Sequence, residues 1–380
     1  MSIRIEITGG DPTAGRTDQD QTLIRDSGCV KSKRPVGTVV DLFCGAGALS
    51  HGFKLEGFSI ACGYDIDEAC RFPFERNNDA PFVRRDISKV HHEEIDKEFP
   101  KKLPRILIGC APCQPFSKYS QGREDPKWHL LADFARLVVG VQPDVLTMEN
   151  VPQLVRFKGG SVFNEFVRQL QEGGYWIKWM EANCPTFGVP QDRSRLVLIG
   201  SKFGEPNLPI PTHKADEYLT VSDAIGDMPH LVAGQTDPDD CLHRSSRMSE
   251  LNFERIRASR PGGTWKEWHT DLVASCHKKH TGRGYISVYG RMQWDQPAPT
   301  ITTQFYGFGN GRFGHPEQNR ALSLREGAIL QTFPRNYAFV EPCKPVQFKR
   351  IGRMIGNAVP VRLAQAIARA VKTHLQEQVH

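Results

Sequence analysis

The sequence predicts an α/β protein with a doubly wound, largely parallel sheet and a second, smaller and irregular domain. Between about residues 35 and 200, short β-branched apolar runs alternate with stretches in which apolar residues recur at helical spacing. From residue 201 to about 320 the alternation stops, and glycine, proline and loop-like segments dominate. Strands that alternate with helices form a sheet with helices on both faces. The first region therefore predicts the sheet, and the second predicts the smaller domain.

The elements follow from these patterns in chain order. We expect strands at residues 37–43, 58–65, 81–87, 105–110, 144–150, 176–182 and 195–201. Helical spacing predicts helices at residues 67–77, 128–141 and 162–174, and a C-terminal helix at 359–376 that packs back on the large domain. The predicted division is a weakly ordered tail at 1–34, a large domain formed by 35–200 and 321–380, and a smaller domain at 201–320.

The composition is that of a globular protein in water. Apolar residues make up 39% of the 380 residues, and no apolar run is long enough to span a membrane. The N-terminus lacks an apolar signal core, so we expect a cytoplasmic protein whose ten cysteines are reduced thiols. The net charge of +6 permits a nucleic-acid partner without establishing one.

A glycine-rich turn follows the first predicted strand, in "VVDLFCGAGALSHGF". Gly45 and Gly47 let the backbone approach a ligand closely, and the next helix start supplies free N–H groups. Asp65 closes the second strand, 18 residues beyond Gly47, a separation that suits a ribose hydroxyl. The next glycine after Gly47 is Gly52, and not a residue three positions on as in the dinucleotide-binding fingerprint. This spacing argues against a nicotinamide oxidoreductase and favours the binding of a nucleoside without a pyrophosphate. Asp86, after the third strand, is placed to bind an adenine amino group.

Two cysteines lie three apart in "GCAPCQPFS", residues 109–117. The other cysteines offer no second close pair, which argues against a structural zinc site, and we predict no metal. The prolines favour a rigid loop over the helix start that carries a redox pair. Cys113 is then the one reactive thiol, at the sheet edge where such folds bind ligands. Cys110 is expected to be the last residue of the buried strand. An inert buried thiol is the alternative for Cys113.

Acid and base groups reach the same edge from later strands. Glu149 closes the strand in "LTMENVPQL", and Asn150 and Pro152 are expected to hold the turn. A carboxyl that shares a proton opposite a thiol is what nucleophilic addition to a pyrimidine requires. Arg193 and Arg195 alternate, so in an extended chain they project to one side and can hold a carbonyl, carboxylate or phosphate. A solvated strand face is the alternative for the two arginines.

Seven blocks, taken together, identify a family. "DLFCGAGALSHGF", "GYDID", "GCAPCQPFS", "MENVPQL", "QDRSRLVLIG", "GRMQWDQPAPTITT" and "MIGNAVP" occur in this order between residues 38 and 370. They resemble the ordered blocks of DNA cytosine-C5 methyltransferases that use S-adenosylmethionine (SAM). The resemblance implies a SAM-dependent methyltransferase Rossmann-like domain and a target-recognition domain. It implies methyl transfer to C5 of a specific cytosine in double-stranded DNA, by base flipping and a covalent bond from Cys113 to C6.

The resemblance also implies a role for individual residues. Those implied in catalysis are Cys113, Glu149, Arg193 and Arg195. Those implied in SAM binding are Phe43, Gly45, Ala46, Gly47, Asp65, Ile66, Asp86, Ile87, Asn357 and Val359. Those implied in DNA binding are Ser117, Tyr119, Arg291, Thr300, Tyr306, Gly307 and Arg312.

Three loop-like stretches are expected to contact DNA. By the resemblance, residues 118–128 form a mobile loop that closes over the flipped base. Residues 300–316 place glycines among aromatic residues and Arg312, which suits contact with base edges. Residues 274–285 contain a basic run that suits contact with phosphates. An ordinary solvated loop is the alternative for each.

The expected setting is a bacterial restriction–modification system, or a related defence or solitary enzyme. We expect a monomer in the cytoplasm, associated with the nucleoid through double-stranded DNA, and compatible with a restriction endonuclease that acts separately. The near alternative is a tRNA cytosine-C5 methyltransferase, a branch with Pro-Pro-Cys and Cys-Phe-Thr blocks where this chain has "CAPCQPFS" and "ANCPTFG". A SAM-binding regulator without turnover would need to have lost Cys113 or Glu149, and both are present.

Overall fold

The computed structural model describes residues 34–112, 116 and 126–378. The predicted tail, apart from Arg34, lies outside this part of the chain. So do Cys113, Ser117 and Tyr119 and most of the loop at 118–128. All described residues belong to one compact unit, Lys33–His380.

The prediction of a doubly wound, largely parallel sheet is confirmed. The described residues form a seven-stranded sheet in the order β3-β2-β1-β4-β5-β8-β6, in which β8 alone runs in the direction opposite to the other six strands. A separate two-stranded ribbon pairs β7 with β9. The strands are β1 (Thr38–Leu42), β2 (Ser59–Asp65), β3 (Phe82–Arg84), β4 (Arg105–Gly109), β5 (Val145–Asn150), β6 (Trp176–Asn183), β7 (Gln191–Asp192), β8 (Ser194–Ser201) and β9 (Ala298–Pro299).

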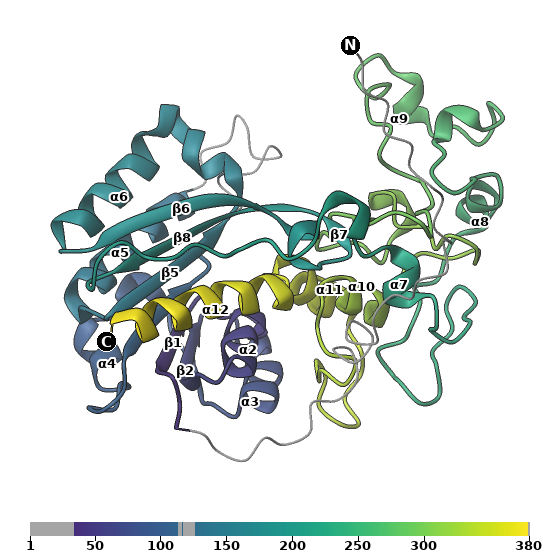
Figure 1. Ribbon diagram of the computed structural model, residues 1–380. Coiled ribbons are helices and arrows are strands. Elements are labelled where there is room, and N and C mark those ends of the chain that lie inside the picture. Colours follow the sequence, from purple (N-terminus) through teal and green to yellow (C-terminus); the bar gives the residue numbers. More distant parts are fainter. Residues whose placement is uncertain (1–33, 113–115, 117–125, 379–380) are drawn as a thin grey trace, which may run out of the picture. The chain divides into compact units, whose positions relative to one another are not determined.

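Helices cover both faces of the sheet (Figure 1). Helices α2, α3 and α12 pack on one face, and α4, α5 and α6 pack on the other. The helices are α2 (Ala48–Leu55), α3 (Arg71–Asn78), α4 (His92–Asp96), α5 (Leu130–Val141), α6 (Ser161–Glu172), α7 (Val221–Ile225), α8 (Glu250–Arg257), α9 (Ser275–Lys278), α10 (Leu324–Leu330), α11 (Phe348–Asn357) and α12 (Val361–Gln378). The C-terminal helix α12 lies along α2, so it packs back on the region predicted as the large domain.

Each central strand supplies both cores, because successive side chains of a strand point to opposite faces. Val39 and Ile106 pack in the core beneath α2 and α12, while the next residues in the chain, Val40 and Leu107, pack beneath α5 and α6. All four side chains have no exposed surface. A strand buried on both faces reads as a continuous apolar run, which is why the sequence identified these strands.

The strand order reverses between β1 and β4. The loop after β1 holds the glycine-rich turn, and the loop after β4 leads to Cys113. In open α/β sheets, ligands bind at such a switch point, outside the carboxyl ends of the strands. The two motifs that the sequence singled out are therefore neighbours at the favoured edge of the sheet.

The region between β8 and α10 contains a small core of its own. Ile256, Trp265, Trp268, Phe308 and Ala321 form this core. The Trp265 ring stacks on His277, with centroids 4.4 Å apart and an interplanar angle of 16°. Other residues of the same region, such as Ile301 and Phe305, pack in the core beneath α2 and α12. The region thus joins the sheet through shared packing.

Arg291 organises this region from within, and the DNA contact implied for it stays a prediction. Its side chain is buried, with 5% of its surface exposed. The guanidinium donates to the backbone carbonyls of Ile256, Ser259, His315 and Gln318. Buried carbonyls that no strand or helix satisfies need such a donor, so the guanidinium is occupied inside the protein.

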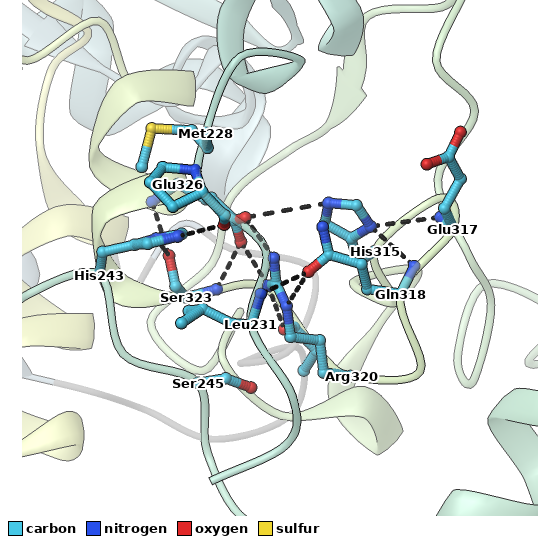
Figure 2. Close-up of polar contacts among 12 residues, drawn as sticks. Met228, Leu231, His243, Ser245, His315, Glu317, Gln318, Arg320, Ser323 and Glu326 are labelled. Carbon is cyan, nitrogen blue, oxygen red and sulfur yellow. Dashed lines mark hydrogen bonds and ion pairs between the residues drawn. The ribbon is translucent and has the colours of Figure 1, made fainter. Parts of the chain in front are cut away.

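A second buried arginine joins this region to α10 (Figure 2). Arg320 and Glu326 are both fully buried, and Arg320 donates to the two carboxylate oxygens at 2.8 and 2.6 Å. Burial alone would raise the pKa of Glu326, but the hydrogen bonds and charge of Arg320 lower it to about 2. Glu326 also accepts from the backbone N–H of Ser323 at the start of α10. This buried ion pair fixes the start of the helix.

His243 adds a second link to the same helix start. Its Nε2 lies 2.8 Å from the carbonyl of Pro229, which can only accept, so Nε2 carries a proton. Its Nδ1 forms a hydrogen bond of 2.9 Å with the hydroxyl of Ser323 (Figure 2). Burial lowers the pKa of the neighbouring His315 to about 3, so the His315 ring is neutral.

We predict that Arg320→Ala destabilises the fold by about 3–5 kcal/mol, because it leaves the Glu326 carboxylate buried without its partner. Arg335→Ala is the matched control, since Arg335 pairs with Asp227 at the surface and there the loss should be much smaller. Unfolding in urea measures both free energies. Equal losses in the two variants would contradict the prediction.

Candidate active site

Glu149 is a buried carboxylate at the carboxyl end of β5. Its side chain is 4% exposed. The Nε atom of Arg195 lies 2.9 Å from its Oε1 atom, and the Arg195 side chain is 13% exposed. The antiparallel pairing of β5 with β8 places Asn150 opposite Leu196, which brings the neighbouring Arg195 to the carboxylate. A carboxylate at this depth needs such a partner, so the strand pairing sets up the charge pair.

Cys110 holds the other oxygen of Glu149, which the sequence did not indicate. Its thiol donates to Oε2 at 2.9 Å. The expectation that Cys110 ends a buried strand is wrong, because β4 ends at Gly109 and Cys110 is partly exposed. The carboxylate therefore lies between a thiol and a guanidinium.

Asn150 fixes the turn after β5, as the sequence predicts. Its side-chain amide donates to the carbonyl of Ala111 at 3.0 Å, and its side-chain oxygen accepts from the N–H of Val151 at 2.9 Å. The first bond crosses from β5 to the chain that leads to Cys113. The ends of β4 and β5 are thus joined by two side chains, Cys110 and Asn150.

Arg193 does not share the environment of Arg195, and the catalytic role implied for the pair stays a prediction. Arg193 is 3% exposed. Its guanidinium donates to the carbonyls of Ile301, Gly356 and Ala358. These carbonyls come from the segment after β9 and from the end of α11. Arg193 therefore ties three parts of the chain together.

The glycine-rich turn has left-handed backbone at three positions. Phe43, Gly45 and Gly47 have φ of 62°, 52° and 88°. A Cβ atom on Gly47 would lie 2.2 Å from the side-chain amide of Asn78, whereas one on Gly45 would meet no atom within 4 Å. Gly47 is therefore required for packing against α3, and Gly45 faces open space. The open side is where a ligand can approach the backbone.

Asp65 holds this turn in place. One carboxylate oxygen accepts from the N–H of Gly45 at 2.9 Å, and the other accepts from the N–H of Asp67 at 2.9 Å. Burial raises the pKa of Asp65, while these hydrogen bonds oppose the rise. The structure thus brings Asp65 to the turn, as the 18-residue spacing suggested. Its predicted contact with a ribose stays a prediction.

A cavity of about 350 Å³ lies beside the end of β2. Ile66, Asp86 and four charged residues (Arg84, Arg85, Lys89 and Glu94) line it. Ile66 is 63% exposed, which is unusual for a large apolar side chain at the end of a strand. An exposed aliphatic face beside a carboxylate fits a flat, partly polar ring such as adenine. Ile87, by contrast, is buried in the core and lies beneath this surface.

The other implied residues are dispersed around these features. Ala46 is buried in the turn; Asn357 is exposed at the end of α11, and Val359 is buried just beyond it. Thr300 is exposed and donates to the carbonyl of Asp192. Tyr306, Gly307 and Arg312 are half-buried. The ligand contacts implied for these seven residues stay predictions.

Asp41 is a buried acid that the sequence analysis missed. It lies in β1 beneath the glycine-rich turn, and its Oδ2 accepts from the hydroxyl of Ser50 at 2.6 Å. Its Oδ1 has no hydrogen-bond partner among the described residues. Burial raises the pKa of Asp41 to about 7. The signal was available, because Asp41 closes an apolar strand just as Asp65 and Glu149 do.

Comparison with known proteins gives one family. The model of the C-5 cytosine-specific DNA methylases matches residues 37–373. The type II methylase M.HgiDII of Herpetosiphon aurantiacus is 48% identical over 342 residues, which span 90% of this chain and 96% of that protein. The type II methyltransferase M1.HphI of Haemophilus parahaemolyticus is 34% identical over 342 residues, spanning 88% of this chain and 86% of that protein.

Solved structures share the fold at low sequence identity. A candidate DNA modification methyltransferase from an E. coli prophage superposes with a TM-score of 0.69 at 22% identity, covering 89% of this chain and 99% of that one. The Dnmt2 methyltransferase of S. pombe superposes with a TM-score of 0.55 at 16% identity, covering 90% of this chain and 99% of that one.

Within the described residues, no helix is long and apolar enough to cross a membrane, and no cluster of side chains suits a metal ion.

We predict that Asp41→Asn stabilises the protein increasingly as the pH rises. The pKa of Asp41 is about 7 in the folded protein against an ordinary value of 3.8, so the folded state holds a proton that the unfolded chain has released. The contribution of Asp41 to the free energy of unfolding is therefore fully present below pH 4 and is lost as the pH rises through 7. The total loss is up to about 4 kcal/mol. Asparagine keeps the acceptor for Ser50 and does not titrate.

The free energy of unfolding in urea, measured for both proteins at pH 4.5, 6 and 8, checks this prediction. The gap should widen with pH in favour of Asp41→Asn. Parallel pH profiles would contradict it.

Proposed function

This chain belongs to the C-5 cytosine-specific DNA methylase family, with type II enzymes among its relatives, and we propose that it methylates cytosine through a covalent adduct of Cys113. The observation that carries the proposal is the buried Glu149 carboxylate, held by Arg195 and Cys110 beside the chain segment that leads to Cys113. A paired acid next to a candidate nucleophile, at the switch point of the sheet, is the arrangement that addition to a pyrimidine needs.

The proposed reaction begins at C6 of the target cytosine. Carbon C5 is too weak a nucleophile to attack a methyl donor directly, so the Cys113 thiolate adds to C6 while Glu149, in its protonated form, gives its proton to N3. The ring becomes an enamine in which C5 is nucleophilic. Arg195, which pairs with Glu149, would stabilise the adduct on the O2 side of the cytosine ring. After methyl transfer a base removes the C5 proton, the C6–S bond breaks, the thiolate leaves, and the proton on N3 returns to Glu149.

SAM would supply the electrophilic methyl group when bound. Open space beside Gly45 and the exposed Ile66 face with Asp86 fit an adenosine moiety. Asp65 would add a hydrogen-bond acceptor for the ribose beside the turn that it braces. By the family resemblance, Asn357 and Val359 would lie near the methionine half.

DNA is the proposed substrate, and its target base must leave the helix to reach Glu149. Extruding a base costs a few kcal/mol, which contacts with the DNA backbone offset. An exposed loop with Lys278, Lys279 and Arg283 supplies such contacts. It rests on the stack of Trp265 and His277, which gives it a rigid base. We propose that residues 201–320 act in target recognition, in a restriction–modification setting.

We predict that Glu149→Gln slows methyl transfer by at least about 100-fold with little change in SAM affinity, because glutamine cannot give a proton to N3. Transfer of labelled methyl from SAM to DNA in single turnovers measures the rate. Glu181→Gln is the matched control, since Glu181 is exposed on the edge strand β6 of the same sheet, and it should match the wild type.

DNA that carries 5-fluorocytosine tests the adduct itself, because fluorine at C5 blocks the final elimination. The wild type should form a covalent complex with such DNA, and Cys113→Ser should not. A wild type that methylates ordinary DNA but never forms this complex would exclude the covalent route. Full activity of Glu149→Gln would remove Glu149 from the mechanism.

We predict that replacing Lys278 and Lys279 by alanine flattens the salt dependence of DNA binding. Each phosphate contact contributes about 0.9 to the slope of log affinity against log salt concentration, so the slope should fall by about 2. Binding titrations at several salt concentrations measure it. Lys101→Ala and Lys102→Ala, exposed before β4, serve as the paired control, and equal changes in both pairs would refute the assignment.

A further inference from the structure

Cys110 contacts the proposed catalytic acid. Its Sγ donates to Oε2 of Glu149 at 2.9 Å, while Arg195 occupies the side of Oε1. The carboxylate is therefore held at both oxygens, by an ion pair on one and by a thiol hydrogen bond on the other. A hydrogen bond to a charged group fixes its direction more firmly than one between neutral groups.

The backbone places this thiol beside Glu149. Gly109 pairs with Met148 in the β4–β5 register, so the residue after Gly109 lies beside the residue after Met148. The N–H of Cys110 donates to the carbonyl of Leu42 in β1 at 3.3 Å. A Cβ atom on Gly109 would lie 2.7 Å from the Phe134 ring, so the strand end is closely packed. Position 110 is thus fixed by three strands and one helix.

We propose that Cys110 is a positioning residue, whose thiol orients the Glu149 carboxylate toward the target cytosine. The proposal rests on the catalytic role proposed for Glu149. A thiol is a weak donor that also accepts weakly. It can therefore hold the empty site in order and release Oε2 when the base arrives. Alanine or valine at this position would remove the donor, whereas serine would keep one.

The fold does not depend on this one bond. Asn150 donates to the carbonyl of Ala111, next to Cys110, and so makes a second link between β5 and the chain after β4. The Arg195 ion pair also remains when the thiol is removed. Loss of the thiol should therefore change the direction of the carboxylate and leave the surrounding strands in place.

The first experiment compares donors at position 110. In single turnovers with labelled SAM, Cys110→Ala and Cys110→Val should each slow methyl transfer about tenfold, and Cys110→Ser should stay within about threefold of the wild type. Affinity for SAM should be unchanged in all three variants. Cys343→Ala is the matched control, because Cys343 is exposed and far along the chain, and it should behave as the wild type. Serine as slow as alanine and valine would overturn the proposal.

The second experiment asks whether Cys110 acts through Glu149. In a Glu149→Ala background, where the acceptor is absent, Cys110→Ala should change the remaining rate less than twofold. A tenfold loss in both backgrounds would mean that Cys110 acts independently of Glu149, and would refute the inference. Failure of the proposed function is a separate result, since it requires Glu149→Gln to retain full activity.

Discussion

A carboxylate buried at the end of β5 is the constraint on which the site depends. Removing Glu149 from water is favourable only if a positive charge and hydrogen-bond donors meet it, and Arg195 provides that charge because β8 runs antiparallel to β5. Two residues earlier in the chain, Arg193 uses its guanidinium on the carbonyls of Ile301, Gly356 and Ala358. One short segment therefore sets the charge of the site and joins it to the rest of the chain.

Local patterns carried the sheet and the acids at its edge. Strands such as β1 and β5 are buried on both faces and carry an acid next to their last residue, so the place of each strand could be predicted from its apolar run. Arg193 and Arg291 could not, because their acceptors are carbonyls up to 165 residues away in the chain. The contact of Cys110 could not be predicted for the same reason, because its partner Glu149 lies on the adjacent strand, 39 residues further along the chain.

The irregular region between β8 and α10 needs buried arginine side chains because it has little regular secondary structure. Short helices and isolated bridges leave many backbone carbonyls without a partner, and such groups must be satisfied when buried. A guanidinium has five N–H donors in one plane, so a single Arg291 satisfies carbonyls from Ile256 to Gln318. Arg320 does the same for the carboxylate of Glu326 and the carbonyl of Ala321. Buried cations thus replace part of the regular hydrogen bonding that the sheet has.

In this region the residues that stabilise the fold are buried, and they are different from the residues that form the exposed surface. The loop with Lys278, Lys279 and Arg283 is exposed, while the groups that support it are the buried His277 ring and the Trp265 ring that stacks on it. Substitutions in the loop leave those supports unchanged, because its side chains point to solvent and make few internal bonds. A protein built in this way can change which surface it presents to DNA without a new core. Substitution of a support should instead affect folding before it affects which DNA is bound.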